Sequence, residues 1–528
     1  MRCWIAALAA GLCPGLLLAQ APADSAPIIR AIEIRRHDVF DPAEATSFVP
    51  RMANRLHFTT RASVVRRELL FRPGLPYDSL AVAETARNLR SIGVFRRVGI
   101  DTVRSDSGLI VRVTTSDGWS TRPITNLNTT GSTLVPTIGL EELNLLGTAT
   151  HLSVRYRIHP DRSTLTTAFR QPRLFAGRVG VGLQYSHLSD GDLFSGSVSK
   201  PFLSLSSRSA WQVFGAARKE RILQFFEGEE EPRITLQRRY ALGYAAAAWA
   251  LRGDPTGYLR LGFSGQLRRE DYADQAAVDT MGRTTTGAIG PFLQWRAARF
   301  LVSTGLEGFA REEDVDVSTT VNLGVQATPR AFGYEDDGIV PWLTVRTGFG
   351  RPNGFVQLSA SGIGRFTSAG LDSGSVHLSA TAFLLPARRH LAVLHGAIGW
   401  QERPRPGAEF DLGLGLGPRI FKEHGFTGNR AFFSSAEYRW TAAENFLNLS
   451  AVGLAGFVDY GGAWYSGFPR RTGFDFGVGV RFGLTRATDI TSSRLDVACR
   501  PGSDQRRFQC RLVLQRGFAF SSNGRLDQ

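Results

Sequence analysis

Residues 410–439 read FDLGLGLGPRIFKEHGFTGNRAFFSSAEYR, and residues 457–461 read FVDYG a short distance further on. As a pattern, this is a glycine-rich loop of over twenty residues between two segments in which apolar and polar residues alternate. The loop carries Arg419, and Glu437 and Asp459 follow on the next two expected strands. A loop of this length inside a strand-rich chain is uncommon unless it has a function.

The stretch resembles the loop signature of the BamA/TamA superfamily of bacterial outer-membrane barrels, also called the surface-antigen family. Ten residues fall on positions of that signature: Arg419, Phe426, Gly428, Arg430, Glu437, Tyr438, Arg439, Phe457, Asp459 and Gly461. We count Phe421, Phe426, Gly428 and Gly461 as the loop motif. The chain departs from the signature at Ile420 and Leu414, which replace glycines, and glycine permits backbone angles that these residues do not.

The resemblance implies that Arg419 folds into the barrel lumen and pairs with Asp459, with Glu437 beside it. Arg430 is expected as a further member of this set. An arginine–carboxylate pair away from water adds little net stability, but removal of one partner costs about 3–5 kcal/mol because a buried charge is left unpaired. Such a pair would therefore fix one position of the loop. The alternative from the residues alone is a solvated loop arginine.

Composition is compatible with a membrane barrel. The chain has 528 residues, of which 57 are glycine and 43% are hydrophobic, and its mean hydropathy is -0.11. Beyond the N-terminus there is no apolar run of about 18 residues, so no transmembrane helix is expected. A membrane barrel conceals its apolar face by alternation. A soluble all-β protein would have the same composition.

The net charge of +15 comes almost entirely from arginine, because lysine occurs only at positions 200, 219 and 422. No basic cluster is interleaved with aromatic residues and no nucleic-acid motif occurs, so nucleic acid is not an expected partner. Arginine facing lipid phosphates, or lining a wet lumen, accounts better for the charge.

The N-terminal part divides into two segments. Residues 1–19 have the charge, the apolar stretch and the small final residue of a secretory signal peptide. Residues 27–116 read as strand, helix, helix, strand, strand, with Thr60 and Asp78 placed to cap the two helices. Gly93, Phe95 and the run at 69–77 resemble a POTRA domain, which implies a periplasmic location and capture of unfolded chains at a sheet edge. The alternative is a small α+β domain without such clients.

Residues 119–520 are predicted to form an outer-membrane β-barrel, and residues 521–528 a C-terminal extension. In one segment, Leu152, Val154, Tyr156 and Ile158 alternate with polar residues, which suits a barrel with lipid outside and water inside. The predicted fold class is thus an all-β antiparallel membrane barrel preceded by a small α+β POTRA domain. The resemblance implies 16 strands, and counting alternating segments gives up to about 20.

Cys499 and Cys510 flank a short loop between the last two expected strands, and a disulfide is predicted there if the chain leaves the cytoplasm. Two unpaired thiols are the alternative. The nine histidines show no metal-ligand spacing, and no nucleophile-elbow motif occurs. We therefore expect no enzyme, no metal and no cofactor.

The resemblance implies insertion or translocation of other polypeptides at the bacterial outer membrane. The expected partners are outer-membrane lipids, unfolded outer-membrane or secreted polypeptides, and a periplasmic partner of the POTRA domain. In that family the first and last strands pair weakly and the barrel opens there to pair with a client strand, since an opened barrel exposes strand edges. The alternatives are a channel, a lipid exporter or a structural barrel without protein clients, and a soluble β-rich binding protein.

Overall fold

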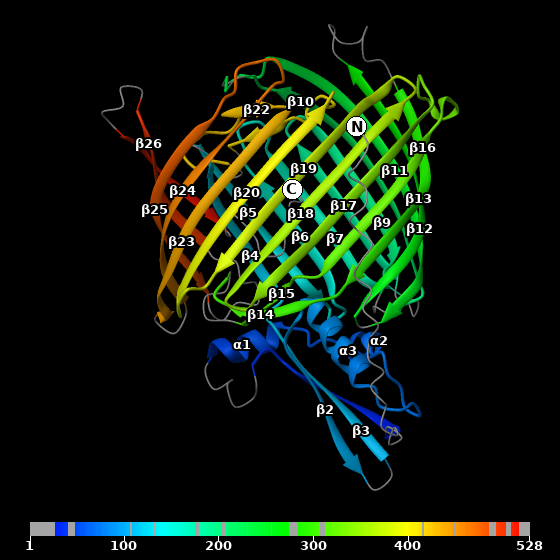
Figure 1. Ribbon diagram of the computed structural model, residues 1–528. Coiled ribbons are helices and arrows are strands. Elements are labelled where there is room, and N and C mark those ends of the chain that lie inside the picture. Colours follow the sequence, from blue (N-terminus) through cyan, green and yellow to red (C-terminus); the bar gives the residue numbers. More distant parts are fainter. Residues whose placement is uncertain are drawn as a thin grey trace, which may run out of the picture.

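The chain forms a closed β-barrel with a small α+β domain at one end, seen in the computed structural model of Figure 1. The described residues are 27–516 apart from 41–47, 106–107, 131–132, 175–178, 203–206, 227, 230, 255, 274–283, 307–311, 414–416, 447–449, 485–492 and 503–507. The expected signal peptide at 1–19 and the extension at 521–528 lie outside these residues. Within the described part, no helix has the length and apolar content needed to cross a membrane.

The N-terminal domain has a three-stranded sheet in the order β1–β3–β2, with β1 parallel and β2 antiparallel to β3. Its core is apolar and includes Val65, Leu89 and Val113, which are almost fully buried. Its elements are β1 (Ile29–His37), α1 (Phe48–Leu56), α2 (Ala62–Glu68), α3 (Ser79–Ser91), β2 (Phe95–Ser105) and β3 (Gly108–Asp117).

Two local predictions for this domain can be compared with the structure. Asp78 caps α3 as predicted, because its carboxylate accepts hydrogen bonds from the backbone N–H groups of Leu80 and Ala81. The predicted cap at Thr60 is wrong. Arg61 precedes α2 without a side-chain cap, and the Thr60 hydroxyl instead donates to Asp117. Helix α1 was not predicted, and its described residues add nothing to the apolar core.

The barrel contains twenty described strands, each antiparallel to its sequence neighbour, and β27 lies beside β4 to close it. They are β4 (Thr121–Thr130), β5 (Thr133–Leu145), β6 (Thr150–Arg157), β7 (Thr164–Leu174), β8 (Val179–Leu188), β9 (Gly191–Lys200), β10 (Ser209–Gln224), β11 (Ile234–Asp254), β12 (Gly257–Ala273), β13 (Thr284–Ala297), β16 (Thr319–Thr328), β17 (Gly338–Arg351), β18 (Gly354–Thr367), β19 (Gly370–Leu384), β20 (His390–Glu402), β23 (Arg430–Phe446), β24 (Ser450–Trp464), β25 (Gly473–Leu484), β26 (Ser493–Pro501) and β27 (Phe508–Arg516).

The predicted antiparallel barrel is confirmed, and its strand number is the upper figure from the sequence. The sixteen strands implied by the resemblance are four too few. Most of the alternating segments are separate strands and not halves of longer ones, because a tilted strand of about 9–11 residues is long enough to cross a bilayer. Since twenty is even, β4 begins and β27 ends at the rim that carries the small domain, here called the near rim.

The outer face of the barrel is apolar, as the alternation predicted. Along β6, Leu152 and Val154 are 36% and 42% exposed, whereas Ser153 between them is 1% exposed and faces inward. On β19, Val376 and Leu378 are also exposed. A closed barrel has no free sheet edge, so its backbone polar groups are paired while its surface stays apolar.

Two short hairpins interrupt the order of the barrel strands. The first, β14 (Phe300–Thr304) with β15 (Glu312–Asp316), follows β13 at the near rim. A buried apolar cluster joins this insertion to the barrel wall and consists of Leu306, Val315, Val317, Phe355, Phe383, Leu391 and Val393. The second, β21 (Phe410–Leu412) with β22 (Phe426–Gly428), lies at the far rim between β20 and β23. A single 3-10 turn, η1 (Arg330–Phe332), is also described.

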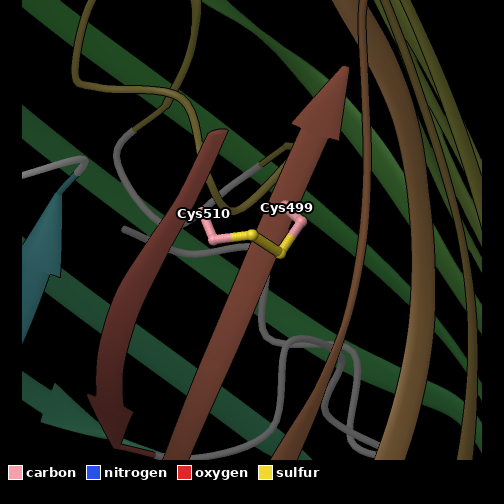
Figure 2. The surroundings of a disulfide bond; sticks show 2 residues. All are labelled: Cys499 and Cys510. Atoms are coloured by element: carbon pink, nitrogen blue, oxygen red, sulfur yellow. A yellow bond between two sulfur atoms is a disulfide. The ribbon is translucent and has the colours of Figure 1, made fainter. Parts of the chain in front are cut away.

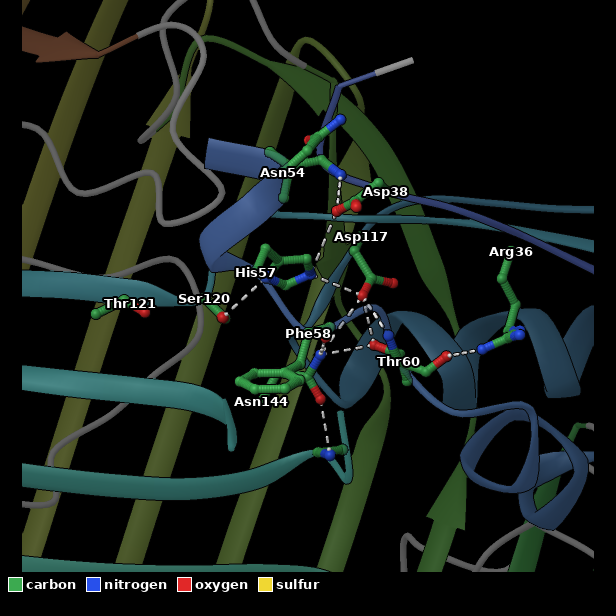
Figure 3. A network of polar contacts seen from close by, with 12 residues as sticks. Arg36, Asp38, Asn54, His57, Phe58, Thr60, Asp117, Ser120, Thr121 and Asn144 are labelled. Carbon is green, nitrogen blue, oxygen red and sulfur yellow. Dashed lines mark hydrogen bonds and ion pairs between the residues drawn. The ribbon is translucent and has the colours of Figure 1, made fainter. Parts of the chain in front are cut away.

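The small domain is joined to the first barrel strands by buried polar contacts (Figure 3). The carboxylate of Asp117 is fully buried and accepts hydrogen bonds from the backbone N–H and the hydroxyl of Thr60, at 2.6 and 2.8 Å. His57 lies 3.0 Å from the same carboxylate, and the Asn144 amide on β5 donates to the Thr60 hydroxyl at 2.9 Å. Charge-assisted hydrogen bonds to Asp117 therefore fix Thr60 within the small domain, and the Asn144 amide links Thr60 to β5.

Candidate functional site

The long loop between β20 and β23 enters the lumen from the far rim. Its hairpin packs against the inner side of β24 through an apolar cluster that includes Phe426, Leu412 and Ala463, with Phe421 beside them. Gly428 comes so close to β24 that a Cβ atom would overlap the backbone carbonyl of Trp464. Gly461 on β24 likewise has no room for a side chain, because the backbone and ring of neighbouring phenylalanines lie against it. The loop motif thus forms the surface where loop and wall meet.

Arg419 lies deep in the lumen and is 7% exposed. Its guanidinium contacts three carboxylates on three strands: Glu437 of β23 at 2.7 Å, Asp459 of β24 at 2.8 Å and Asp496 of β26 at 2.8 Å. It also lies over the ring of Phe457, 3.7 Å from the centroid. One loop side chain therefore binds three strands of the wall.

The predicted pair belongs to a larger set, here called the lumen cluster. It has four arginines and four carboxylates, all buried: Arg419, Arg439, Arg481, Arg494, Glu437, Asp459, Asp475 and Asp496. Arg481 contacts Glu437 at 3.1 Å and also pairs with Asp496. The formal charges balance, which is how buried charges are tolerated in a low-dielectric site.

The sequence prediction found only part of this cluster. Arg494 and Asp496 alternate with Leu495 and Val497 on β26, and that alternation marks them as inward-facing. No sequence signal says which inward residues of different strands come together. The ion pairs of Arg419 with carboxylates on three strands suit this arrangement to holding the loop in place.

Ile420, one departure from the family signature, is an anchor. Its side chain is 2% exposed and packs with Phe457, Ala498 and Val513. Its backbone N–H donates to Asp475 at 2.8 Å. Ile420 is not among the residues with positive φ, so glycine is not required there. Leu414, the other departure, lies outside the described residues.

Arg430 does not belong to the lumen cluster, contrary to the prediction. It opens β23 at the far rim, donates to the backbone oxygens of Gln401 and Asn429, and lies 3.6 Å from Glu402. The physical reason is the direction of the chain, because the loop descends to Arg419 and returns to the rim before β23 begins.

The lumen cluster also contacts the insertion at the opposite end of the barrel. Arg439 donates through Nε to Glu437 and through Nη1 to the backbone oxygen of Leu306, at 3.2 Å. Leu306 belongs to the apolar cluster of the near-rim insertion. Glu437 is thus the shared partner that connects the far-rim loop with the near-rim insertion.

Cys499 and Cys510 form a disulfide between β26 and β27 (Figure 2). They are directly opposite in the strand register, next to the pair formed by Ala498 and Arg511. The bond joins β27 covalently to β26. Within the described residues, β27 and β4 make the least extensive contact of any two neighbouring barrel strands.

A second polar group lies at the far rim, where the β6–β7 turn meets the loop. It comprises His159 and Asp161 from the turn, and Glu423 and His424 from the loop, with His159 Nε2 2.8 Å from Glu423. Burial raises the pKa of Glu423. Burial lowers the pKa of His424, but hydrogen bonds to Asp161 and Asp411 outweigh it and raise the value to about 9. The sequence analysis missed this group because its two halves are far apart in the chain.

No family model and no curated protein matches the chain. Among solved structures it is similar to BamA from Haemophilus ducreyi lacking POTRA domains 1–3, with a TM-score of 0.44 and 10% identity over 93% of this chain and 84% of that chain. For CdiB from Escherichia coli the TM-score is 0.45, with 11% identity over 92% of this chain and 76% of that chain. For the siderophore receptor PirA from Acinetobacter baumannii the TM-score is 0.39, with 8% identity over 79% of this chain and 84% of that chain. The TM-scores for these different kinds of barrel lie in the same low range.

Proposed function

We propose that this chain is an outer-membrane protein that inserts or translocates other polypeptides by opening between β4 and β27. The observation that carries the proposal is the limited contact between the described parts of these two strands, compared with the more extensive contacts between the other neighbouring strands as described. Separation of two strands exposes unpaired N–H and C=O groups, and such an edge can pair with an incoming strand.

The apolar outer face supports a location in the outer membrane, with lipids as partners. We assign residues 27–116 as a POTRA-like domain on the periplasmic side, where its sheet would receive unfolded chains or a periplasmic partner. Asp117 at the end of β3 is held by Thr60, and only three residues separate Asp117 from the first residue of β4. Movement of the domain would therefore act on one strand of the proposed opening.

The contents of the lumen favour this proposal over an open channel. Arg419 and the loop hairpin occupy the lumen from the far rim, and the apolar cluster around Leu306 occupies it from the near rim. Both groups narrow the path that a solute would take through the lumen.

The experiment is a disulfide lock across β4 and β27. Single cysteines replace Thr125 on β4 and Leu514 on β27, after Cys499 and Cys510 are changed to serine, in cells depleted of the native copy. If the proposal is right, oxidation stops surface delivery of other barrels or of a secreted partner, and reductant restores it.

The matched control keeps the cysteine at Thr125 and pairs it with one at Ile138, its direct partner in the β4–β5 hairpin. This lock joins strands that the proposal keeps together, so delivery should continue. Undiminished delivery by the β4–β27 lock would refute lateral opening and leave the channel, exporter or structural alternatives.

A further inference from the structure

We propose that His159, Asp161 and Glu423 bind one divalent metal ion of the zinc class, which fastens the lumen loop to the β6–β7 turn. One ligand atom from each of the three residues can be chosen so that all lie within 4.8 Å of one another. This inference is independent of the proposed function, because it concerns a site at the far rim and not the opening of the wall.

Glu423 is the observation that points to a ligand. Its side chain is 8% exposed, and its Oε2 has no hydrogen-bond partner among the described residues. Its Oε1 is paired with His159 Nε2, at 2.8 Å. A buried carboxylate oxygen without a partner is costly unless it coordinates a cation.

The remaining donors complete a metal-binding set. His159 is nearly buried, with 10% of its side chain exposed, and Asp161 is 27% exposed. One imidazole and two carboxylates are ligands typical of zinc sites, and the two carboxylates would neutralise a divalent ion. Asp161 leaves one side accessible to water, and a cavity of about 620 Å³ adjoins all three residues, which gives an ion a path of entry.

His424 is a neighbour of the set. Its two ring nitrogens are engaged by Asp161, at 3.0 Å, and by Asp411. Its ring stacks on Phe225 of the β10–β11 loop, with the centroids 3.4 Å apart. These contacts hold the loop segment that carries Glu423 against the wall, so Glu423 and the turn are already close before an ion binds.

The consequence of binding follows from where the ligands come from. Two ligands belong to the β6–β7 turn of the wall and one belongs to the loop, four residues after Arg419. An ion that joins them would attach the loop to β6 and β7, whereas the lumen cluster attaches it to β23, β24 and β26. The loop would then be held from two sides of the barrel.

The first test measures binding of Zn²⁺ alone. The full chain is purified in detergent, stripped with a chelator and dialysed against a series of free Zn²⁺ concentrations, and bound metal is counted by mass spectrometry. We expect one ion per chain, and at least a tenfold weaker affinity in His159→Gln and Glu423→Gln. The control is His187→Gln, which alters an exposed histidine 3.0 Å from Asp192 that belongs to no group of three possible ligands in the described residues.

Folding of each variant is checked by its heat-dependent mobility on a denaturing gel. If a variant does not fold, X-ray absorption at the zinc edge of the wild type gives an independent answer, with one imidazole and two carboxylates expected in the first shell. Equal affinity in wild type, His159→Gln and Glu423→Gln overturns the proposal, as does a wild-type first shell without imidazole.

The second test measures how the ion holds the loop. Trypsin can cleave after Lys422, which directly precedes Glu423. If release of the ion is needed before cleavage, a free Zn²⁺ concentration of about one hundred times Kd should slow cleavage about 100-fold. An unchanged rate in the wild type with one ion bound would show that the ion does not fasten the loop.

Discussion

The guanidinium of Arg419 lies 2.8 Å from the carboxylate of Asp459, although one belongs to a loop and the other to the barrel wall. Both side chains are almost completely buried. Such a contact exchanges the hydration of two charges for their mutual attraction, so it adds little net stability while it is intact. Its value lies in fixing the position of the loop, and the cost appears when one partner is removed.

Replacement of Arg419 by methionine should therefore lower the free energy of unfolding by about 3–5 kcal/mol, because three carboxylates lose their shared cation. Urea unfolding of the barrel in lipid vesicles, followed by gel mobility, measures this. Arg430→Met is the matched control, since Arg430 donates to backbone oxygens at the half-buried rim and should cost about 1 kcal/mol or less. If the free energy of unfolding fell equally in the two variants, the role assigned to Arg419 would be contradicted.

Asp459→Asn combined with Arg419→Met should destabilise less than the sum of the two single changes. The second substitution removes a charge that the first has already left unpaired, and contacting residues typically couple by about 0.5–3 kcal/mol. A double-mutant cycle on the same unfolding assay gives the coupling. Strict additivity would mean that the two residues do not interact in the folded protein.

Gly428→Ala should detach the loop hairpin from β24, because the added methyl group would overlap the Trp464 carbonyl. We expect faster tryptic cleavage after Lys422 and little change in the barrel itself. Gly396→Ala on β20 is the control, since a Cβ atom there meets nothing within 4 Å. Cleavage at the wild-type rate in Gly428→Ala would show that the close approach is not required.

Replacement of both Cys499 and Cys510 by alanine should loosen β27. A disulfide closing a short loop contributes about 2–4 kcal/mol, chiefly by restricting the unfolded chain. Hydrogen exchange measured by mass spectrometry should rise in peptides from β27 and stay unchanged in peptides from β17 and β18, which serve as the internal control. Equal exchange in β27 with and without the disulfide would show that strand pairing alone holds it.

Asn144→Ala should loosen the small domain from the barrel. The substitution removes the hydrogen bonds that the Asn144 amide on β5 donates to the Thr60 hydroxyl and to the backbone oxygen of Phe58. The distribution of distances between one spin label on the domain and one on the barrel should broaden. Asp101→Ala, at an exposed site on β2, should leave that distribution unchanged. A narrow distribution in both variants would mean that the remaining contacts, such as Arg173 with Glu68 at 2.7 Å, suffice.

The sequence by itself determined the features that depend on neighbours along the chain. Alternation of Leu152 and Val154 with Ser153 predicts a strand with one apolar face, because successive side chains point to opposite sides. Asp78 predicts the start of the helix that it caps, and the glycine-rich stretch predicts a long loop. Counting alternating segments set an upper figure of about 20 strands, which the structure reaches, whereas the 16 strands implied by the family resemblance are too few.

Only the tertiary structure decided which inward-facing residues meet. Closure of the barrel brings Arg419 to Asp496 and His159 to Glu423, and no local rule relates residues so far apart. Arg430 shows the converse, since it matches the motif but lies where the chain has already returned to the rim. Thr60 likewise has the chemistry of a helix cap, yet the buried carboxylate of Asp117 accepts its hydrogen bond. A buried charge gains more from a hydrogen bond than a helix end exposed to water does, and that competition is settled only when the chain is folded.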